Sequence, residues 1–563
     1  MATAERTQTG RAGWAAGWAL PAVAALVALA VLAPLLGRGF VLGYDMVFTP
    51  RLWLTPDALG LGSSLPRSVP VDAVVALTTV VVPGDIAQKA ALAAALFGAV
   101  LGAGRLVPTE VTGAKIVAGL FYGWSAYVAE RLFIGHWVLL LAYAALPWVA
   151  LAALRLRHGT GRPARDLAAL VLACVPAALT PTGGILAAGV ALACAGRRRA
   201  AVVALLSAAL NAPWWVPSLL HAGGGLSDPA GIAAFGARAE NWGGPVVGVL
   251  GLGGVWNGDV VPGSRANPAL PVLVLVVVAV GLWGMRAMAL RWRTTAPIAL
   301  GALGVLLAAL PALPLGVDLL RWVIEVVPGA GLLRDSQKWV AWWALPLAVG
   351  VALAVERAGR LVLLGVAAFP VLVMPDLAWA GWGRLAAVDY PPDWDRVAAI
   401  LAEDRRPGDV LALPLSAFRR FAWNEGRTQL DPAPRYLPRP VVIDDTLHVG
   451  GRPVAGEDAR VAAIRADLPA SPGRHGIGWV LVEHGTPGLV DPALLRRLEP
   501  VHTGPWLTLY RVPDHQEPTR PGPHPLPVLV ADFAALALVG GALLWRVLPG
   551  GRLSPSRPGR SEE

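Results

Sequence analysis

The sequence predicts an α-helical polytopic membrane protein with about twelve transmembrane helices and one α/β domain near the C-terminus. Hydrophobic residues make up 55% of the 563 residues and charged residues 15%. The apolar residues gather in repeated runs of about 17 to 25, the length that crosses the ~30 Å hydrocarbon core of a bilayer. Short arginine clusters separate these runs, as the positive-inside rule expects of cytoplasmic loops. This distribution accounts for the net charge of +10, and we expect no nucleic-acid partner.

The membrane domain is expected over residues 1–375, with its N-terminus in the cytoplasm. Basic clusters recur in alternate loops between the apolar runs, and the strongest begins at Arg155. This alternation places the long first loop, residues 37–84, outside the cell. The expected transmembrane helices cover residues 14–36, 86–103, 115–128, 137–154, 167–179, 185–195, 200–220, 268–283, 296–312, 340–355, 361–374 and 525–548.

The segment 376–524 is polar and proline-rich, which sets it apart from the apolar runs. Short strand-like stretches such as 410–415 and 479–483 indicate a folded α/β domain. The last transmembrane helix, 525–548, and a basic tail, 549–563, follow it. We therefore expect the α/β domain outside the cell and the tail in the cytoplasm.

Several chemistries are disfavoured by the sequence. The two cysteines, Cys174 and Cys194, lie inside apolar runs, so neither a disulfide framework nor a thiolate metal site is expected. The acidic and histidine pairs of the α/β domain show no metal-ligand spacing, and no metal ligand is assigned. The sequence contains no Walker loop, dinucleotide fingerprint or nucleophile elbow between a plausible strand and a plausible helix. Nucleotide-driven transport and serine hydrolysis are therefore disfavoured.

Charged residues gather at the outer ends of the expected helices. Glu130, Arg131 and His136 directly precede a long apolar run, and the topology brings Asp45, close after the end of the first helix, to the same side. Ionisable groups near hydrocarbon cost several kcal/mol unless they are paired or wetted. The group therefore predicts a functional site, with an interfacial anchor of arginine and aromatic residues as the alternative.

A second charged group stands before another outer helix end, in the segment GLLRDSQKW. It contains Arg334, Asp335 and Lys338, and Lys338 is one of only three lysines in the chain. Lys338 also faces the side that the positive-inside rule disfavours. If the segment is helical, Arg334 and Lys338 lie one turn apart on one face and form a clamp for an anion.

This organisation resembles the GT-C class of lipid-dependent glycosyltransferases. The shared features are a long first outer loop with an aspartate close to its start, charged outer loops and a soluble domain near the C-terminus. The segments FIGHWVLLLAYAALPW and GLLRDSQKW also resemble YfhO-type bacterial membrane proteins and actinobacterial cell-wall arabinofuranosyl- and mannosyltransferases. Many GT-C members carry an acidic pair or an acidic-x-acidic motif in the first loop, whereas Asp45 stands alone in GYDMVF.

The resemblance implies a GT-C-like fold and sugar transfer on the outer face. The donor would be a polyprenyl-phosphate sugar and the acceptor an envelope glycan or glycolipid, and participation of a divalent cation stays open. Asp45 is the first candidate for the catalytic base and Glu130 the second, because the acceptor hydroxyl must lose a proton. The candidates that hold the donor phosphate are Arg131, His136, Arg334 and Lys338, supported by Asp335 and Trp137.

The α/β domain is expected to bind the saccharide acceptor rather than to perform the chemistry. Aromatic side chains stack on sugar rings, although burial in the domain core is the alternative for each of them. The aromatic candidates are Trp394, Trp423, Tyr436 and Trp506.

Other interpretations remain open at this stage. Asp45 is equally suited to an ordinary turn, Asp335 to a helix N-cap, and His136 to structural hydrogen bonding at the interface. For the whole protein, the alternatives are a transporter or flippase of lipid-linked saccharides and a noncatalytic envelope assembly protein. Transporters tend to keep ionisable groups near the bilayer midplane. Here the charges gather at the outer ends, which favours chemistry at the membrane surface over translocation and leaves the assembly protein open.

Overall fold

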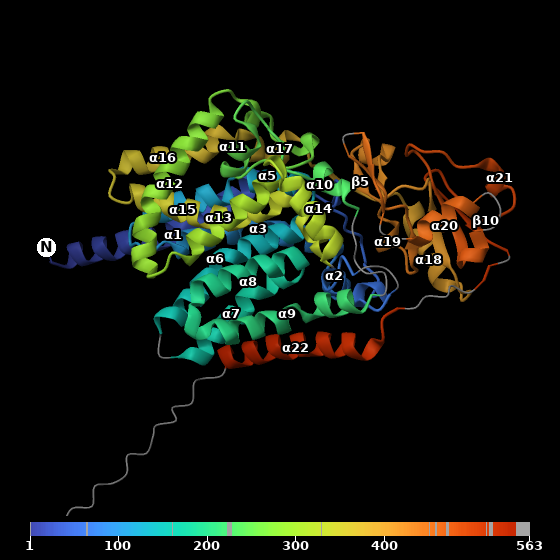
Figure 1. Ribbon diagram of the computed structural model, residues 1–563, viewed down its shortest axis with the longest axis horizontal. Helices are drawn as coiled ribbons and strands as arrows, with labels where there is room; N and C mark the ends of the chain where they lie inside the picture. The colour runs from blue at the N-terminus through green and yellow to red at the C-terminus, as the bar shows by residue number, and fades with distance from the viewer. Residues whose placement is uncertain are drawn as a thin grey trace, which may run out of the picture.

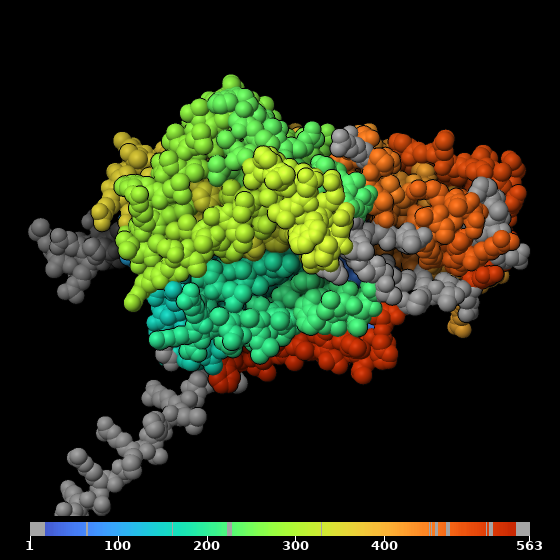
Figure 2. Space-filling model, viewed as in Figure 1, coloured from blue at the N-terminus to red at the C-terminus, as the bar shows by residue number. Residues whose placement is uncertain are grey.

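The computed structural model describes residues 2–62, 66–159, 162–221, 228–327, 329–449, 451–456, 459–468, 472–513, 515–516 and 522–547. A helical bundle forms one part of the molecule, and the α/β domain lies against one end of it (Figure 1). In the space-filling view this domain forms a separate orange and red lobe beside the bundle (Figure 2).

Within the described residues, seven helices are long and apolar enough to cross a membrane, or up to nine if each of two bent pairs is one span. The seven spans contain α1 (Ala2–Leu32), α3 (Gly84–Leu106), α6 (Trp137–His158), α9 (Ala200–Leu220), α12 (Leu270–Trp292), α15 (Ala341–Val355) and α22 (Pro525–Val547). The bent pairs are α13 (Ala296–Ala309) with α14 (Gly316–Val326), and α16 (Arg360–Val373) with α17 (Ala378–Trp382).

The expected count of twelve transmembrane helices is not confirmed. The three helices expected over 115–128, 167–179 and 185–195 correspond to short elements of 12, 16 and 15 residues. A helix of 16 residues is only about 24 Å long, less than the hydrocarbon thickness. These elements are α4 (Thr112–Gly123), α7 (Pro163–Ala178) and α8 (Pro181–Ala195), and α4 is followed by α5 (Ala126–Phe133).

Helix α6 lies at the centre of one half of the bundle, where it packs against α3, α7 and α8. In the other half, α12 packs along α15. Two glycines allow their backbones to approach closely, because a Cβ atom on Gly284 would lie 1.8 Å from the carbonyl oxygen of Gly350. Small residues at such crossings are the usual means of packing helices in lipid, where a hydrophobic driving force is lacking.

The α/β domain contains a mixed five-stranded sheet with the strand order β10-β11-β9-β3-β6. Strand β3 pairs in parallel with β6 and β9, while β11 pairs antiparallel with β9 and β10. Helix α18 (Asp393–Glu403) contributes Trp394 to one hydrophobic face of the sheet and α20 (Ala459–Asp467) contributes Ile464 to the other. The strands are β3 (Asp409–Leu413), β6 (Val441–Val442), β9 (Ile477–Glu483), β10 (Glu499–Thr503) and β11 (Leu507–Arg511).

The first loop is joined to the segment that leads into the α/β domain. Strand β1 (Phe40–Val41) pairs antiparallel with β2 (Ala387–Val388). Beyond it, the backbone of Tyr44 donates to the carbonyl of Thr428 and accepts from the N–H of Leu430, both at 2.7 Å. The loop that carries Asp45 is therefore fixed to the α/β domain as well as to the bundle.

Candidate functional site

Asp45 lies at the tip of a tight turn between the bundle and the α/β domain. The turn is closed by mutual backbone hydrogen bonds between Gly43 and Met46, at 3.2 and 2.9 Å. The N–H of Asp45 donates to the carbonyl of Ile134 at 3.1 Å, which places the turn on the junction between α5 and α6. Gly135 permits this approach, because a Cβ atom there would lie 2.2 Å from the nitrogen of Met46.

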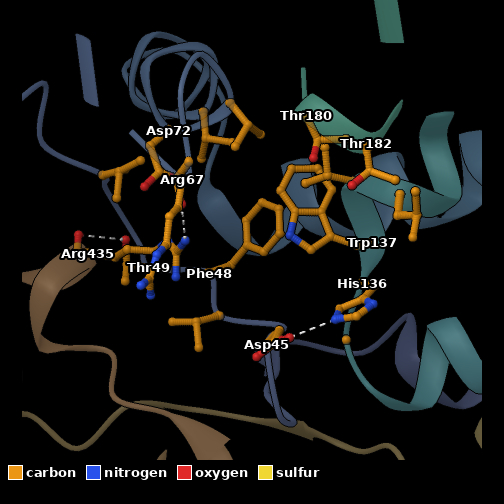
Figure 3. A pocket seen from close by; sticks show the side chains of 18 of the residues that line it. Asp45, Phe48, Thr49, Arg67, Asp72, His136, Trp137, Thr180, Thr182 and Arg435 are labelled. Atoms are coloured by element: carbon orange, nitrogen blue, oxygen red, sulfur yellow. Dashed lines mark hydrogen bonds and ion pairs between the residues drawn. The ribbon is translucent and has the colours of Figure 1, made fainter. Parts of the chain in front are cut away.

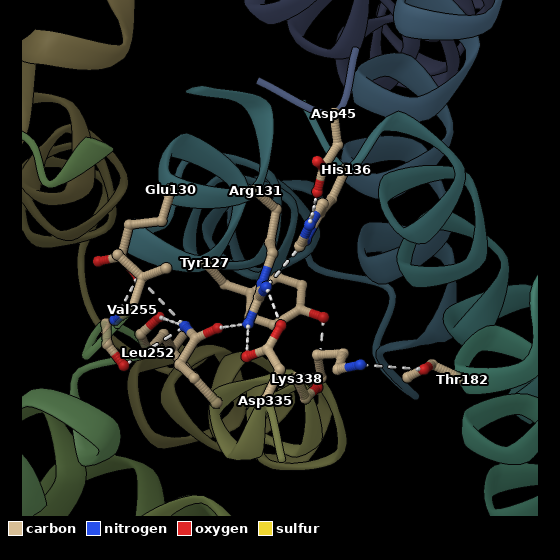
Figure 4. A network of polar contacts seen from close by, with 12 residues as sticks. Asp45, Tyr127, Glu130, Arg131, His136, Thr182, Leu252, Val255, Asp335 and Lys338 are labelled. Carbon is tan, nitrogen blue, oxygen red and sulfur yellow. Dashed lines mark hydrogen bonds and ion pairs between the residues drawn. The ribbon is translucent and has the colours of Figure 1, made fainter. Parts of the chain in front are cut away.

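His136 connects Asp45 to the buried Arg131 (Figure 4). Its Nε2 lies 2.8 Å from Oδ2 of Asp45, and its Nδ1 lies 2.9 Å from Nη1 of Arg131. A guanidinium only donates, so Nδ1 accepts and the imidazole proton sits on Nε2. His136 therefore donates a hydrogen bond to the Asp45 carboxylate, and Arg131 fixes the tautomer that does so.

Arg131 is completely buried and is held by Asp335. Its two terminal nitrogens donate to the two carboxylate oxygens at 2.7 and 3.0 Å, and Nη2 also donates to Oε1 of Gln337. Burial raises the pKa of Asp335, but the charges of Arg131 and Lys338 outweigh this effect and lower it to about 2. Asp335 is therefore an anion that neutralises Arg131, and its side chain makes no N-cap hydrogen bond.

Glu130 precedes Arg131 on α5 and is also completely buried. Its Oε2 accepts from the backbone N–H of Val255 and from Nε2 of Gln337, each at 3.2 Å. Burial and the nearby carboxylate of Glu240 raise its pKa. Glu240 in turn forms an ion pair with Arg265 at 2.7 Å. Glu130 lines neither of the cavities described below, so the structure separates it from Asp45.

Two cavities meet at Asp45. The bundle cavity contains about 860 Å³ of space free of protein atoms and lies between the first loop, α6 and α8 (Figure 3). The interdomain cavity contains about 1800 Å³ and lies between the bundle and the α/β domain. Asp45, His136 and Lys338 line both of them. These residues therefore form a wall that the two cavities share.

Lys338 is the cationic member of this wall. Its Nζ is 3.5 Å from Oγ1 of Thr182, and its carbonyl accepts from the hydroxyl of Tyr127 at 3.3 Å. Lys338 and Arg334 are not one turn apart in a single helix, because a break at Arg334 and Asp335 separates two 3-10 helices. The break gives the carboxylate of Asp335 its direction toward Arg131, and Arg334 nevertheless lines the interdomain cavity together with Lys338.

The remaining residues predicted for the site are divided between the cavities and the protein interior. Trp137 lines the bundle cavity and packs on Phe48 at 4.7 Å between ring centres. Arg131 lines neither cavity. Trp394 and Tyr436 are buried in the core of the α/β domain, so neither ring is available to a sugar.

The sequence analysis missed several residues that line the cavities. Thr182 falls in the short connection between the helices expected at 167–179 and 185–195. Arg435 gives no sequence signal, because it reaches the bundle cavity only through the contact between the α/β domain and the first loop. The aromatic residues of the interdomain cavity lie in segments whose sequence did not indicate a saccharide-binding site. They are Tyr44, Phe235, Trp256 and Phe418.

No protein-family model and no curated protein matches the chain. Among solved structures, the chain resembles the cryo-EM structure of arabinofuranosyltransferase AftD from Mycobacteria, with a TM-score of 0.54 and 18% identity over 87% of this chain and 40% of that one. A second structure, the R1389S mutant of AftD in class 2, gives a TM-score of 0.54 and 18% identity over 89% and 42% of the two chains. The chain therefore has a GT-C-like fold and spans about two fifths of the length of AftD.

Proposed function

We propose that this protein is a membrane glycosyltransferase that moves a sugar from a polyprenyl-phosphate donor to an envelope glycan or glycolipid on the outer face. The observation that carries the proposal is the wall of Asp45, His136 and Lys338, which faces two cavities at once. A transfer reaction needs two substrates to meet at one carboxylate, and this wall offers that meeting point. The likeness in fold to an arabinofuranosyltransferase supports the same class of reaction.

The bundle cavity suits the lipid-linked donor. Its lining combines apolar side chains, among them Phe48, Val75 and Trp137, with the cationic side chains of Arg67 and Arg435. A polyprenyl phosphate has the same division into an apolar chain and a charged head. Lys338 lines the same cavity, and its ammonium group would stabilise the negative charge that develops on the phosphate as the sugar leaves.

Asp45 would serve as the general base. Its side chain is 42% exposed and lies at the boundary of both cavities. The acceptor hydroxyl oxygen bonds to the anomeric carbon, the bond from that carbon to the phosphate oxygen breaks, and Asp45 takes the hydroxyl proton. His136 donates to Asp45 and holds the carboxylate in place, while the buried Arg131 acts through His136 rather than on the substrate. Asp335, which lines the interdomain cavity, holds Arg131.

The interdomain cavity suits the saccharide acceptor. The α/β domain contributes Ser416, Thr428 and His448, whose polar side chains match the hydroxyl groups of a sugar. The bundle side contributes the rings of Phe235 and Trp256, which offer surfaces for stacking. These rings replace the buried aromatic residues of the α/β domain as the acceptor contacts that we propose.

The test is transfer from a radiolabelled polyprenyl-phosphate sugar in membranes that contain Asp45→Asn. We expect a loss of roughly 10² to 10⁴ in turnover at normal expression, because a general base acts mainly in the transition state. The matched control is Asp318→Asn, which removes an exposed carboxylate on α14 and should leave the rate unchanged. Near-normal transfer by Asp45→Asn would exclude this mechanism. Absence of transfer by the unmodified protein across the common donors would favour a transporter or an assembly protein instead.

A further inference from the structure

A third cavity lies at the end of the bundle opposite the α/β domain, between α3, α6, α7 and α22. We call it the arginine cavity, because Arg105, Arg155 and Arg546 line it. It contains about 720 Å³ of space free of protein atoms. Each arginine comes from a different helix, at or near its C-terminal end. The fold therefore gathers three cations that are far apart in the sequence.

The three arginines form no ion pair within the described part of the chain, although Arg105 also lines a second hollow that contains Glu110 and Glu356. None of their side chains makes an ion pair or a hydrogen bond there, and no acidic side chain lines the cavity. The guanidinium of Arg105 instead lies 5.4 Å from the ring centre of Trp148. By contrast, Arg291 and Lys115 on the same side of the bundle pair with Glu356 and Glu110. Three like charges around one cavity favour an anionic occupant.

The walls of the arginine cavity are apolar and belong to helices of the bundle. Trp148 and Leu151 of α6 face Leu172 of α7 across it. Beside Arg546, Leu544 and Trp545 are exposed on α22, as expected of residues that meet lipid chains and headgroups. An anion that fills this site must also cover apolar surface. A phospholipid meets both requirements, whereas a soluble phosphate meets only the first.

We propose that the arginine cavity binds an anionic phospholipid, with a headgroup that carries two phosphates preferred over a headgroup that carries one. The phosphates lie among Arg105, Arg155 and Arg546, and an acyl chain lies against Trp148, Leu151 and Leu172. Basic pockets between transmembrane helices are known as sites for such headgroups on the cytoplasmic side. The preference follows from the charge, because one phosphodiester neutralises only one of three guanidinium groups.

The site has a structural purpose for α22. This helix packs on α7 and α9. Only 22% of its apolar 18-residue stretch is buried inside the protein, the lowest share among the seven spans of the described chain. A lipid held between Arg546 and the arginines of α3 and α6 attaches the end of α22 to the bundle. The bound lipid therefore stabilises the protein, and this effect does not depend on sugar transfer.

The test measures lipid binding and thermal unfolding of the full chain in neutral detergent. Diphosphatidylglycerol, phosphatidylglycerol and phosphatidylcholine are titrated separately, and inorganic phosphate is added as a fourth probe. We expect the two-phosphate lipid to bind most tightly and to raise the unfolding temperature by several degrees. Equal effects of phosphatidylcholine, or full stabilisation by inorganic phosphate, would overturn the proposal. These four titrations use the unmodified protein, so they do not depend on whether a variant folds.

A triple variant then locates the site. Arg105→Gln, Arg155→Gln and Arg546→Gln together should weaken binding of the two-phosphate lipid by roughly 100-fold, since each surface arginine contributes about tenfold or less. The matched control replaces Arg197, Arg198 and Arg199 by Gln, which removes three exposed arginines between α8 and α9 and leaves the arginine cavity intact. Equal losses in both triple variants would show unspecific attraction to charge and would contradict the proposal.

Discussion

At the scale of single residues, the candidate site depends on a buried charge that lines neither cavity. Arg131 is buried, and its guanidinium is shared among Asp335, Gln337 and His136. A buried cation without a partner is strongly unfavourable, so the carboxylate of Asp335 is needed to neutralise Arg131 in the protein interior. Arg131 in turn fixes the proton of His136 and through it the orientation of Asp45.

The ionisation of Asp335 predicts a specific loss of stability in acid. Its pKa of about 2 in the folded protein lies below the ordinary value of 3.8. Its contribution is therefore complete above about pH 5 and is lost as the pH falls from about 4 through 2, by about 2 kcal/mol. The measurement is the free energy of unfolding in detergent across this range, for the unmodified protein and for Asp335→Asn.

Asp335→Asn should be less stable by about 3 to 5 kcal/mol at neutral pH, because it leaves Arg131 without its partner. The difference from the unmodified protein should then narrow below pH 4. The control is Asp318→Asn, since its pair with Arg321 is exposed and contributes at most about 1 kcal/mol. A constant difference between the unmodified protein and Asp335→Asn at all pH values would contradict the ionised state of Asp335.

At the scale of elements, the junction between α5 and α6 positions the turn that carries Asp45. Gly135 has a φ of +84° at this junction and lies in contact with the backbone of Gly43 and Met46. The absence of a side chain there allows Asp45 to approach His136. The position of the candidate base is therefore set by a backbone contact rather than by side chains alone.

We expect Gly135→Ala to lower the transfer rate by 10- to 100-fold, since a displacement of about 1 Å at a catalytic group has an effect of this size. The control is Gly159→Ala, which has a similar φ of +74° but meets no atom within 4 Å. Both variants carry the strain of a positive φ, and only Gly135→Ala displaces the turn. The comparison uses initial rates of transfer, together with unfolding temperatures. Equal rates in the two variants would show that the contact with Met46 is unimportant.

The sequence predicted the long helices well, because their apolar length is a local property. Helices such as α3, α6 and α12 lie where uninterrupted apolar runs were expected. The short helices α7 and α8 were counted as full spans, because apolar composition does not reveal where a helix ends inside a bundle. The pairing of β1 with β2 joins two-residue strands that carry no periodic signal.

The site was predictable as a region but not as an arrangement. Charge at the ends of apolar runs brought together Asp45, His136 and Lys338, which do share one wall. The same signal also selects Glu130 and Arg131, which are buried and line neither cavity. Neighbours on a helix point in different directions around its axis. Tertiary packing therefore decides which ionisable residue lines a cavity and which one is buried and only positions its neighbours.

At the scale of the whole molecule, distant parts of the chain are joined around the site. The first loop pairs with residues 387–388 through β1 and contacts residues 428–430 through Tyr44. Ion pairs connect Asp72 with Arg435 and Arg67 with Asp445 across the same boundary. The candidate site is thus formed only when the loop, the bundle and the α/β domain are assembled together.

This arrangement predicts a disulfide between cysteines introduced at positions 40 and 388. Phe40 and Val388 are direct partners in the antiparallel pair, so their side chains lie on the same face. Oxidation of the variant with Phe40→Cys and Val388→Cys should link the two peptides, which mass spectrometry identifies. The natural cysteines are buried and should not interfere.

The control for this crosslink combines Phe40→Cys with Ala387→Cys. Residue 387 is paired with Val41 instead, and its side chain lies on the other face of the ribbon. We expect little crosslinking in this variant. Efficient linkage in the control, or none in the pair at 40 and 388, would contradict the register of β1 and β2.

The backbone contacts of Tyr44 determine when, during synthesis, the turn with Asp45 can take its final arrangement. Its partners Thr428 and Leu430 are made more than 380 residues later. At ribosomal speeds of about 5 to 20 residues per second, the turn with Asp45 waits roughly 20 to 80 s for them. The helices from α3 to α17 are made during that interval, and α22 is made after it. The turn that carries Asp45 therefore reaches its final arrangement only after residues 428–430 have been made.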